Sequence, residues 1–121
     1  MKQVLIIVLV LSFTYAQQGL NLKDLEPGKS GKLMYPYSGK VFDYWPNGDV
    51  RVRGRLRNGL RNGKWEFFHT NGSRMAVGKY FDGDGSDIDP ETKIPRKGFV
   101  GNWTLYYKSG QQWQEGSWKD G

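Results

Sequence analysis

Twelve glycines in this chain are spaced as three copies of one pattern. Within each copy, the gaps between successive glycines are nine, six and five residues. The second copy begins 24 residues after the first, and the third begins 38 after the second, which is the same interval plus an insertion of 14. The glycines are Gly39, Gly48, Gly54 and Gly59, then Gly63, Gly72, Gly78 and Gly83, then Gly101, Gly110, Gly116 and Gly121. Self-similarity at a fixed offset indicates a repeat architecture, so we predict repeats at residues 38–59, 60–83 and 98–121, with a loop insertion at 84–97.

Each copy has the composition of a β-hairpin. Aromatic and β-branched residues favour a pleated sheet, and they fill the first arms, residues 41–45, 65–69 and 103–107. The second arms are residues 50–56, 75–81 and 113–118. Between the arms stand Asn47-Gly48, Asn71-Gly72 and Ser109-Gly110, and Asn-Gly pairs favour type I′ turns in which both central residues have positive φ. We therefore predict an all-β fold in which three β-hairpins form an open, antiparallel, single-layer meander.

Three glycines occupy the middle of the second arms, at Gly54, Gly78 and Gly116. A glycine inside a strand usually marks a bulge or a close approach by a neighbouring group. Because aromatic residues are abundant, we expect that neighbour to be a ring on the same face. Each hairpin would then contact the next through an aromatic ring that fills the space left by a glycine.

The segments GKWEFFHTNG (residues 63–72) and GNWTLYYKSG (residues 101–110) show a family resemblance. They resemble the MORN-repeat variant G-x-W-x-x-Y-x-x-N-G, which is the repeat of the YwqK-type antitoxin family. The resemblance covers residues 38–121 and places Trp65 and Trp103 at the tryptophan of the motif. Val41 stands at that position in the first copy, and Phe68 replaces the tyrosine in the second. The resemblance implies MORN-like hairpin repeats and an antitoxin role, which in an exported protein would be that of an immunity protein.

Residues 1–16 have the pattern of a secretory signal peptide. Lys2 precedes an apolar run at residues 4–11, and small residues flank Tyr15 before a cleavage position near Ala16. The alternative is an uncleaved membrane anchor, although the apolar run is about half the ~20 residues that span a bilayer. We therefore predict an exported protein, periplasmic or extracellular. Residues 17–37 match no repeat and are expected to cap the first hairpin, with Met34, Tyr35 and Tyr37 as cover.

Arginine alternates with apolar residues or glycine along one predicted strand. On a continuous strand the alternation puts the four guanidinium groups on one face. Such an Arg51–Arg57 stripe could bind anionic lipid, anionic glycan or an acidic partner, or it could be a solvated face that protects a sheet edge. Nucleic acid is not an expected partner of an exported protein. The stripe comprises Arg51, Arg53, Arg55 and Arg57.

The insertion is rich in acidic residues, with Asp84, Asp87, Asp89 and Glu91 following Asp82. Oxygen-rich clusters can hold Ca²⁺, but this spacing does not match the twelve-residue calcium loop with its central glycine and terminal glutamate. We therefore predict no metal site and interpret the insertion as an exposed loop stiffened by two prolines.

The tryptophans and tyrosines of the hairpins allow two interpretations. They could stack as the core of the sheet, since a single-layer sheet must bury the rings of one face. Alternatively, they could line a groove for a carbohydrate or a peptide. The residues expected to be exposed for contact are Trp113, Trp45 and Tyr107, with Trp113 placed on the face opposite the core.

Nothing in the composition points to catalysis or to a cofactor. The chain has a single histidine and no cysteine, whereas metal sites and nucleophilic centres are usually built from several such residues. We therefore predict a non-enzymatic module that binds or scaffolds a partner protein through its sheet face or an open edge. The alternatives are docking on anionic lipid or glycan through the Arg51–Arg57 stripe, and an immunity-type antitoxin. An uncovered terminal hairpin also invites self-association.

Overall fold

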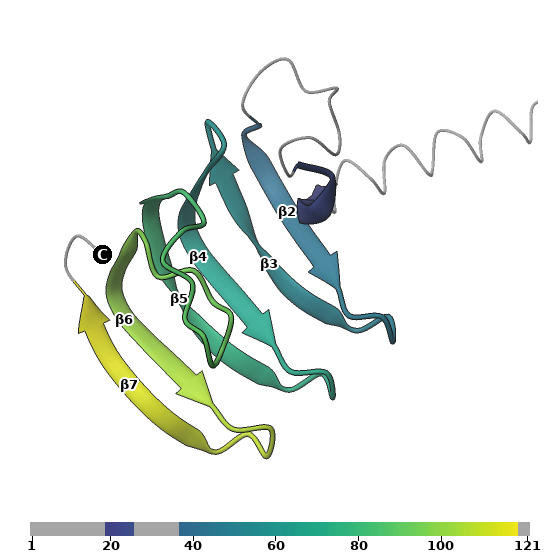
Figure 1. Cartoon of the computed structure of the whole chain (residues 1–121), viewed down its shortest axis with the longest axis vertical. Coiled ribbons are helices and arrows are strands. Elements are labelled where there is room, and N and C mark those ends of the chain that lie inside the picture. The colour runs from purple at the N-terminus through teal and green to yellow at the C-terminus, as the bar shows by residue number, and fades with distance from the viewer. Residues whose placement is uncertain (1–18, 26–36, 119–121) are drawn as a thin grey trace, which may run out of the picture.

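The computed structural model describes residues 19–25 and 37–118. Three predictions lie outside the described residues. They are the signal peptide, the covering of the first hairpin by Met34 and Tyr35, and the last glycine of the repeat pattern, Gly121. The described part contains one seven-stranded sheet in which strand order follows chain order (Figure 1). The all-β class and the open sheet are therefore confirmed. The elements are β1 Leu20–Asn21, the 3₁₀ helix η1 Leu22–Leu25, β2 Gly39–Tyr44, β3 Val50–Arg57, β4 Leu60–Phe68, β5 Arg74–Gly83, β6 Phe99–Tyr106 and β7 Gln112–Trp118.

Antiparallel pairing joins every neighbouring pair of strands from β2 to β7, and only the short β1 pairs in parallel, with β2. The pairs β2–β3, β4–β5 and β6–β7 correspond to the predicted hairpins. The intervening pairs are antiparallel as well, so the chain forms one continuous meander.

The turns at Asn47-Gly48, Asn71-Gly72 and Ser109-Gly110 are not of type I′, and that prediction is wrong. Only the glycine of each pair has positive φ, at 93° for Gly48, 86° for Gly72 and 91° for Gly110. In the first turn the Gly48 N–H donates to the carbonyl of Trp45, while Trp45 N–H donates to the carbonyl of Asp49. Three residues therefore form the loop, and a three-residue hairpin needs one left-handed residue after a type I turn. The two-residue turn with positive φ at both positions is instead Asn58-Gly59, between β3 and β4.

Each of these three-residue turns is followed by a register shift in its hairpin. In the first hairpin Asp43 pairs with Val52 but Tyr44 pairs with Val50, so Arg51 is the extra residue of a bulge. The second and third hairpins have the same shift, with Met75 and Trp113 as the extra residues. A one-residue shift exchanges the faces of the residues beyond it. This shift decides where several candidate site residues lie.

The core lies on one face of the sheet, here called the core face. Trp65 and Trp103 are fully buried there, and Phe99 stacks on Trp103 with ring centroids 3.7 Å apart. The expected approach of rings to strand glycines is present at two positions. A Cβ on Gly54 would lie 2.1 Å from the Trp65 ring, and one on Gly78 would lie 2.0 Å from the Trp103 ring.

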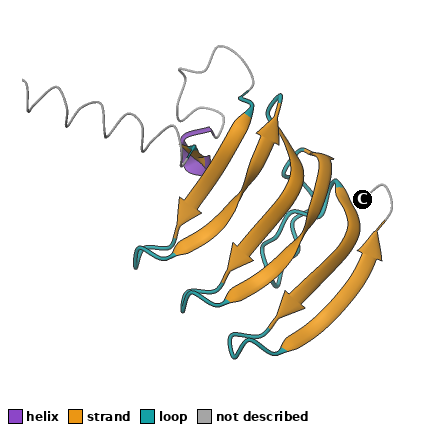
Figure 2. Cartoon of the chain, turned by 180° about the vertical axis from the view of Figure 1, so that it is seen from behind, coloured by secondary structure: helices purple, strands orange, loops and turns teal. Residues whose placement is uncertain are grey.

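The insertion between β5 and β6 crosses the core face instead of standing free in solvent (Figures 1 and 2). Ile94 is 3% exposed, and the hydroxyl of Tyr80 donates a hydrogen bond to the carbonyl of Pro95. The prediction of an exposed loop is wrong for these residues, because a single sheet needs a second layer over its apolar face. Asp84, Asp87 and Glu91 do remain exposed, whereas Asp89 is half-buried.

The N-terminal segment covers the other end of the core face. Leu22 and Leu25 of η1 and Tyr37 pack against the core cluster. Lys23 forms an ion pair of 3.6 Å with Asp43, whose side chain is 1% exposed. These contacts close the core beside β2.

Candidate anion-binding groove

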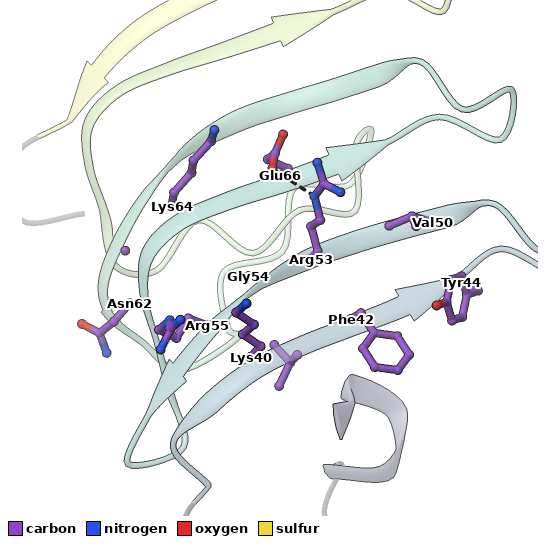
Figure 3. A pocket seen from close by; sticks show the side chains of 12 residues that line it. Lys40, Phe42, Tyr44, Val50, Arg53, Gly54, Arg55, Asn62, Lys64 and Glu66 are labelled. Atoms are coloured by element: carbon purple, nitrogen blue, oxygen red, sulfur yellow. Dashed lines mark hydrogen bonds and ion pairs between the residues drawn. The ribbon is translucent and has the colours of Figure 1, made fainter. Parts of the chain in front are cut away.

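The face opposite the core, here called the outer face, carries an open groove of about 510 Å³ over β2, β3 and β4. Figure 3 shows side chains from the three strands projecting into it. One end is apolar, with Phe42, Tyr44 and Val50. The remainder is polar and mostly cationic, with Lys40, Arg53, Arg55, Asn62, Lys64 and Glu66. Four cations and one carboxylate therefore line this cationic groove.

The prediction that Arg51, Arg53, Arg55 and Arg57 share one face is wrong for Arg51. Cross-strand partners lie on the same face, and Val50 pairs with Tyr44 whereas Arg53 pairs with Phe42. Val50 therefore takes the outer-face position that alternation assigns to Arg51. The Arg51 guanidinium lies 2.7 Å from the buried carboxylate of Asp43 on the core face.

Two of the outer-face arginines are held by carboxylates. Arg53 Nε donates to Glu66 at 3.0 Å, and Arg57 lies 3.2 Å from Asp82. Arg57 stands outside the groove lining. The interpretation of these arginines as edge protection is also wrong, because β3 lies inside the sheet between β2 and β4.

The cations of the groove without a carboxylate partner are Lys40, Arg55 and Lys64. None forms an ion pair within the described residues. Lys40 is the cross-strand partner of Arg55, and Lys64 is the partner of Lys79 on β5. Like charges directly opposite each other destabilise a sheet, so these pairs are costly unless an anion binds between them.

The stripe predicted from the sequence did not include Lys40, and Lys64 lies only beyond its end. The strand alternation that identified the arginines concerns one strand only. The register of the hairpin could have predicted the position of Lys40, because counting outward from the turn at Asn47-Gly48 places Lys40 near Arg55. To predict the position of Lys64 on β4, the register of strands β3 and β4 across the turn at Asn58-Gly59 is also required.

Glu66 is the single carboxylate in the groove lining and is 8% exposed. Arg74 Nη2 lies 2.7 Å from its second oxygen, while Arg53 holds the first. Burial acts to raise the pKa of Glu66, but the hydrogen bond and charge of Arg53, together with Lys64 and Arg74, outweigh it, so the net pKa is lowered. The carboxylate is thus ionised in the folded protein over the physiological range.

Replacing Glu66 with glutamine is expected to remove part of the acid sensitivity of the fold. Because the folded-state pKa is below the unfolded value, the ionised form contributes stability that is fully present above pH ~4.5 and is lost as the pH falls through the folded pKa. Wild type should therefore exceed Glu66→Gln in melting temperature at pH 7, and the difference should shrink towards pH 3. Thermal unfolding from pH 3 to 7 checks this. A constant difference would contradict it, and Glu115→Gln, at an exposed position on β7, is the control.

The three aromatic residues predicted to be exposed for contact have different positions. Trp113 packs against the core cluster and is half-buried, so its placement on the opposite face is wrong because of the bulge. Trp45 is also half-buried, and its indole Nε1 donates to the carbonyl of Phe68 at 3.0 Å. Tyr107 is 53% exposed.

The acidic residues of the insertion are occupied with local contacts. Asp84 accepts hydrogen bonds from Ser86, and both Asp87 and Asp89 lie near Arg96.

His69 Nε2 lies 2.8 Å from the carbonyl of Tyr106. Within residues 19–25 and 37–118, no three histidine or acidic side chains gather in a way suited to a metal ion. The same residues contain no helix long and apolar enough to cross a membrane.

Comparison of the chain with family models, with curated proteins and with solved structures gives no match.

Proposed function

We propose that this protein is a non-enzymatic binding module whose cationic groove holds an acidic segment of a partner protein. The observation that carries the proposal is the cross-strand pairing of Lys40 with Arg55 and of Lys64 with Lys79. None of these four cations forms an ion pair with a carboxylate among the described residues. An anionic ligand removes the repulsion within each pair. The apolar end formed by Phe42, Tyr44 and Val50 gives a neighbouring hydrophobic side chain of the ligand a place to bind.

The mixed apolar and cationic lining of the groove favours a chain segment over a membrane surface. Peptide sites combine apolar contacts with a few placed polar groups, and this groove has both. Anionic glycan and anionic lipid are the competing ligands, because they share the negative charge but not the apolar side chain.

Replacing Arg55 with glutamate is expected to weaken the binding of an acidic peptide by about tenfold, because it reverses one charge in the groove. The probe is a fluorescein-labelled peptide of alternating glutamate and leucine, followed by fluorescence anisotropy. Lys108→Glu is the matched control, since it changes the net charge equally at an exposed turn between β6 and β7. Binding to the control should remain within about twofold of wild type, and all affinities should fall with added salt.

Parallel titrations with a heparin oligosaccharide and with phosphatidylserine vesicles decide the ligand class. Saturable binding to the vesicles or to heparin alone would overturn the proposal in favour of lipid or glycan docking. Equal losses for Arg55→Glu and Lys108→Glu would show a nonspecific charge effect and would overturn it as well.

We further propose that the three hairpins are MORN-like repeats of an exported protein. Support comes from the spacing of the glycines, from the resemblance at residues 63–72 and 101–110, and from the recurrence of the turn, bulge and glycine–ring contact. The pattern of residues 1–16 supports export. An immunity role outside the cytoplasm agrees with the resemblance, and an acidic toxin surface would then be the ligand of the groove.

A further inference from the structure

Adjacent hairpins in this sheet are joined by the same contact of an indole with a glycine. The ring of Trp65 covers Gly54, and its Nε1 donates to the carbonyl of the next residue, Arg55, at 3.1 Å. The ring of Trp103 covers Gly78, and its Nε1 donates to the carbonyl of Lys79 at 2.9 Å. In both cases the second arm of one hairpin accepts a tryptophan from the first arm of the next.

Two further contacts accompany each indole. Near the turns, Trp45 Nε1 donates to the carbonyl of Phe68, and His69 Nε2 donates to that of Tyr106. The amides of Asn47 and Asn71 donate to the carbonyls of Thr70 and Lys108 respectively. Phe68 and Thr70 are the third and fifth residues after Trp65, and Tyr106 and Lys108 are the third and fifth residues after Trp103. One hairpin therefore recognises the next by a fixed set of contacts.

By sequence position, β7 carries the residues that correspond to the accepting strands of the first two hairpins. Gly116 occupies the position of Gly54 and Gly78 and is partly exposed. Tyr107 and Ser109 occupy the positions of the donors near the turn, and Tyr107 is 53% exposed. In the described sheet β7 is the final strand and pairs only with β6.

We propose that the edge of β7 that has no partner strand among the described residues accepts an antiparallel strand of a partner protein. This strand carries a tryptophan, which covers Gly116. This is β-strand addition, in which main-chain hydrogen bonds give affinity and side-chain pockets give specificity. The indole donates to the carbonyl of Ser117, and the Tyr107 hydroxyl donates to the carbonyl of the third residue after the tryptophan. The site is separate from the cationic groove over β2–β4.

The register of the accepted strands defines the partner sequence. The residue after Trp65 or Trp103 pairs with Arg53 or Val77, and the second residue after it is apolar and pairs with Val52 or Ala76. A glycine with positive φ precedes each tryptophan by two positions, at Gly63 and Gly101. The expected partner motif is therefore Gly-x-Trp-x-(Phe/Leu). Its fourth residue lies opposite Glu115, so that an uncharged or basic residue suits it better than an acidic one.

The test uses the full chain and a fluorescein-labelled peptide with the sequence of residues 99–109, FVGNWTLYYKS. We expect saturable binding in fluorescence anisotropy. Alanine in place of the peptide tryptophan should weaken it at least about tenfold, since burial of an indole is lost. Gly116→Val should weaken it by a similar factor, because the new side chain would take the place that the indole needs. Asn102→Val, at an exposed position on the neighbouring strand β6, is the matched control and should bind as wild type does.

Each alternative outcome is distinguishable. Absence of saturable binding, or equal binding by wild type and Gly116→Val, would overturn the proposal. If light scattering shows a dimer that Gly116→Val dissociates, a second copy occupies the edge and the partner strand is excluded. Circular dichroism verifies that Gly116→Val is folded. Arg55→Glu should leave the binding of this peptide unchanged, because Arg55 lies in the groove and not on β7. The groove proposal and the edge proposal can therefore fail independently.

Discussion

Introducing a single methyl group at Gly78 is expected to destabilise the fold by about 3 kcal/mol or more. The Cβ of Gly78→Ala would lie 2.0 Å from Cδ2 of Trp103 and 2.2 Å from Cε2, and a real Cβ does not approach an atom so closely. The indole has little freedom to move away, because Trp103 is fully buried and Phe99 stacks on it. Chemical denaturation with urea gives the free energy of unfolding.

A second glycine separates steric crowding from backbone strain. No atom lies within 4 Å of a Cβ built on Gly48, but its φ is 93°, which an L-residue adopts only with strain. Gly48→Ala should therefore cost about 1–2 kcal/mol, which is less than Gly78→Ala. Equal costs for the two variants would contradict the importance of the ring contact at Gly78.

The spacing of glycines, together with the turn residues and strand formers between them, predicted the open sheet and its strands β2 to β7 but not the short strand β1. Turn residues and strand formers alternate so regularly that the hairpins could be placed within one or two residues, and the mid-strand glycines indicated a close ring. This information is local: glycine allows a conformation or an approach that other residues do not. The antiparallel pairing then follows from the short connections, except between β5 and β6, which the insertion joins.

The faces of several residues could not be predicted from alternation. Arg51 and Trp113 are on the core side because each turn is a three-residue loop followed by a bulge, and the bulge depends on main-chain hydrogen bonds such as that from Trp45 N–H to the carbonyl of Asp49. A type I′ turn without the bulge would have left both on the outer face.

The cationic groove and the cover of the core depend on contacts between distant segments. Lys40 and Arg55 are 15 residues apart in the sequence, and their juxtaposition follows from register and not from composition. Likewise, the insertion contains two isoleucines, of which Ile94 is buried and Ile88 is exposed. The burial of Ile94 could be inferred only from the need to cover Tyr80 and Phe99. A short apolar segment in a polar loop gives no signal of its own.

Removing the indole of Trp103 is expected to be as damaging as crowding it, with a loss of about 3–5 kcal/mol for Trp103→Ala. The ring contacts Phe99, Tyr80 and Phe67, with centroid distances of 3.7, 5.1 and 6.3 Å. Its Nε1 also donates to the carbonyl of Lys79. Trp113→Ala is the control, since that ring is half-buried beside the core, and it should cost about 1–2 kcal/mol. Urea denaturation measures both.

Combining the two substitutions tests whether the glycine and the indole act as one unit. In the Trp103→Ala background no ring opposes the new methyl group, so Gly78→Ala should cost less than about 1 kcal/mol and the coupling energy should be about 2 kcal/mol or more. Strictly additive losses, within about 0.5 kcal/mol, would mean that each substitution acts on something other than their contact. A large coupling energy would show that this contact joins the second hairpin to the third. It would also measure, within the same sheet, the kind of glycine–indole contact that is proposed for Gly116 on β7.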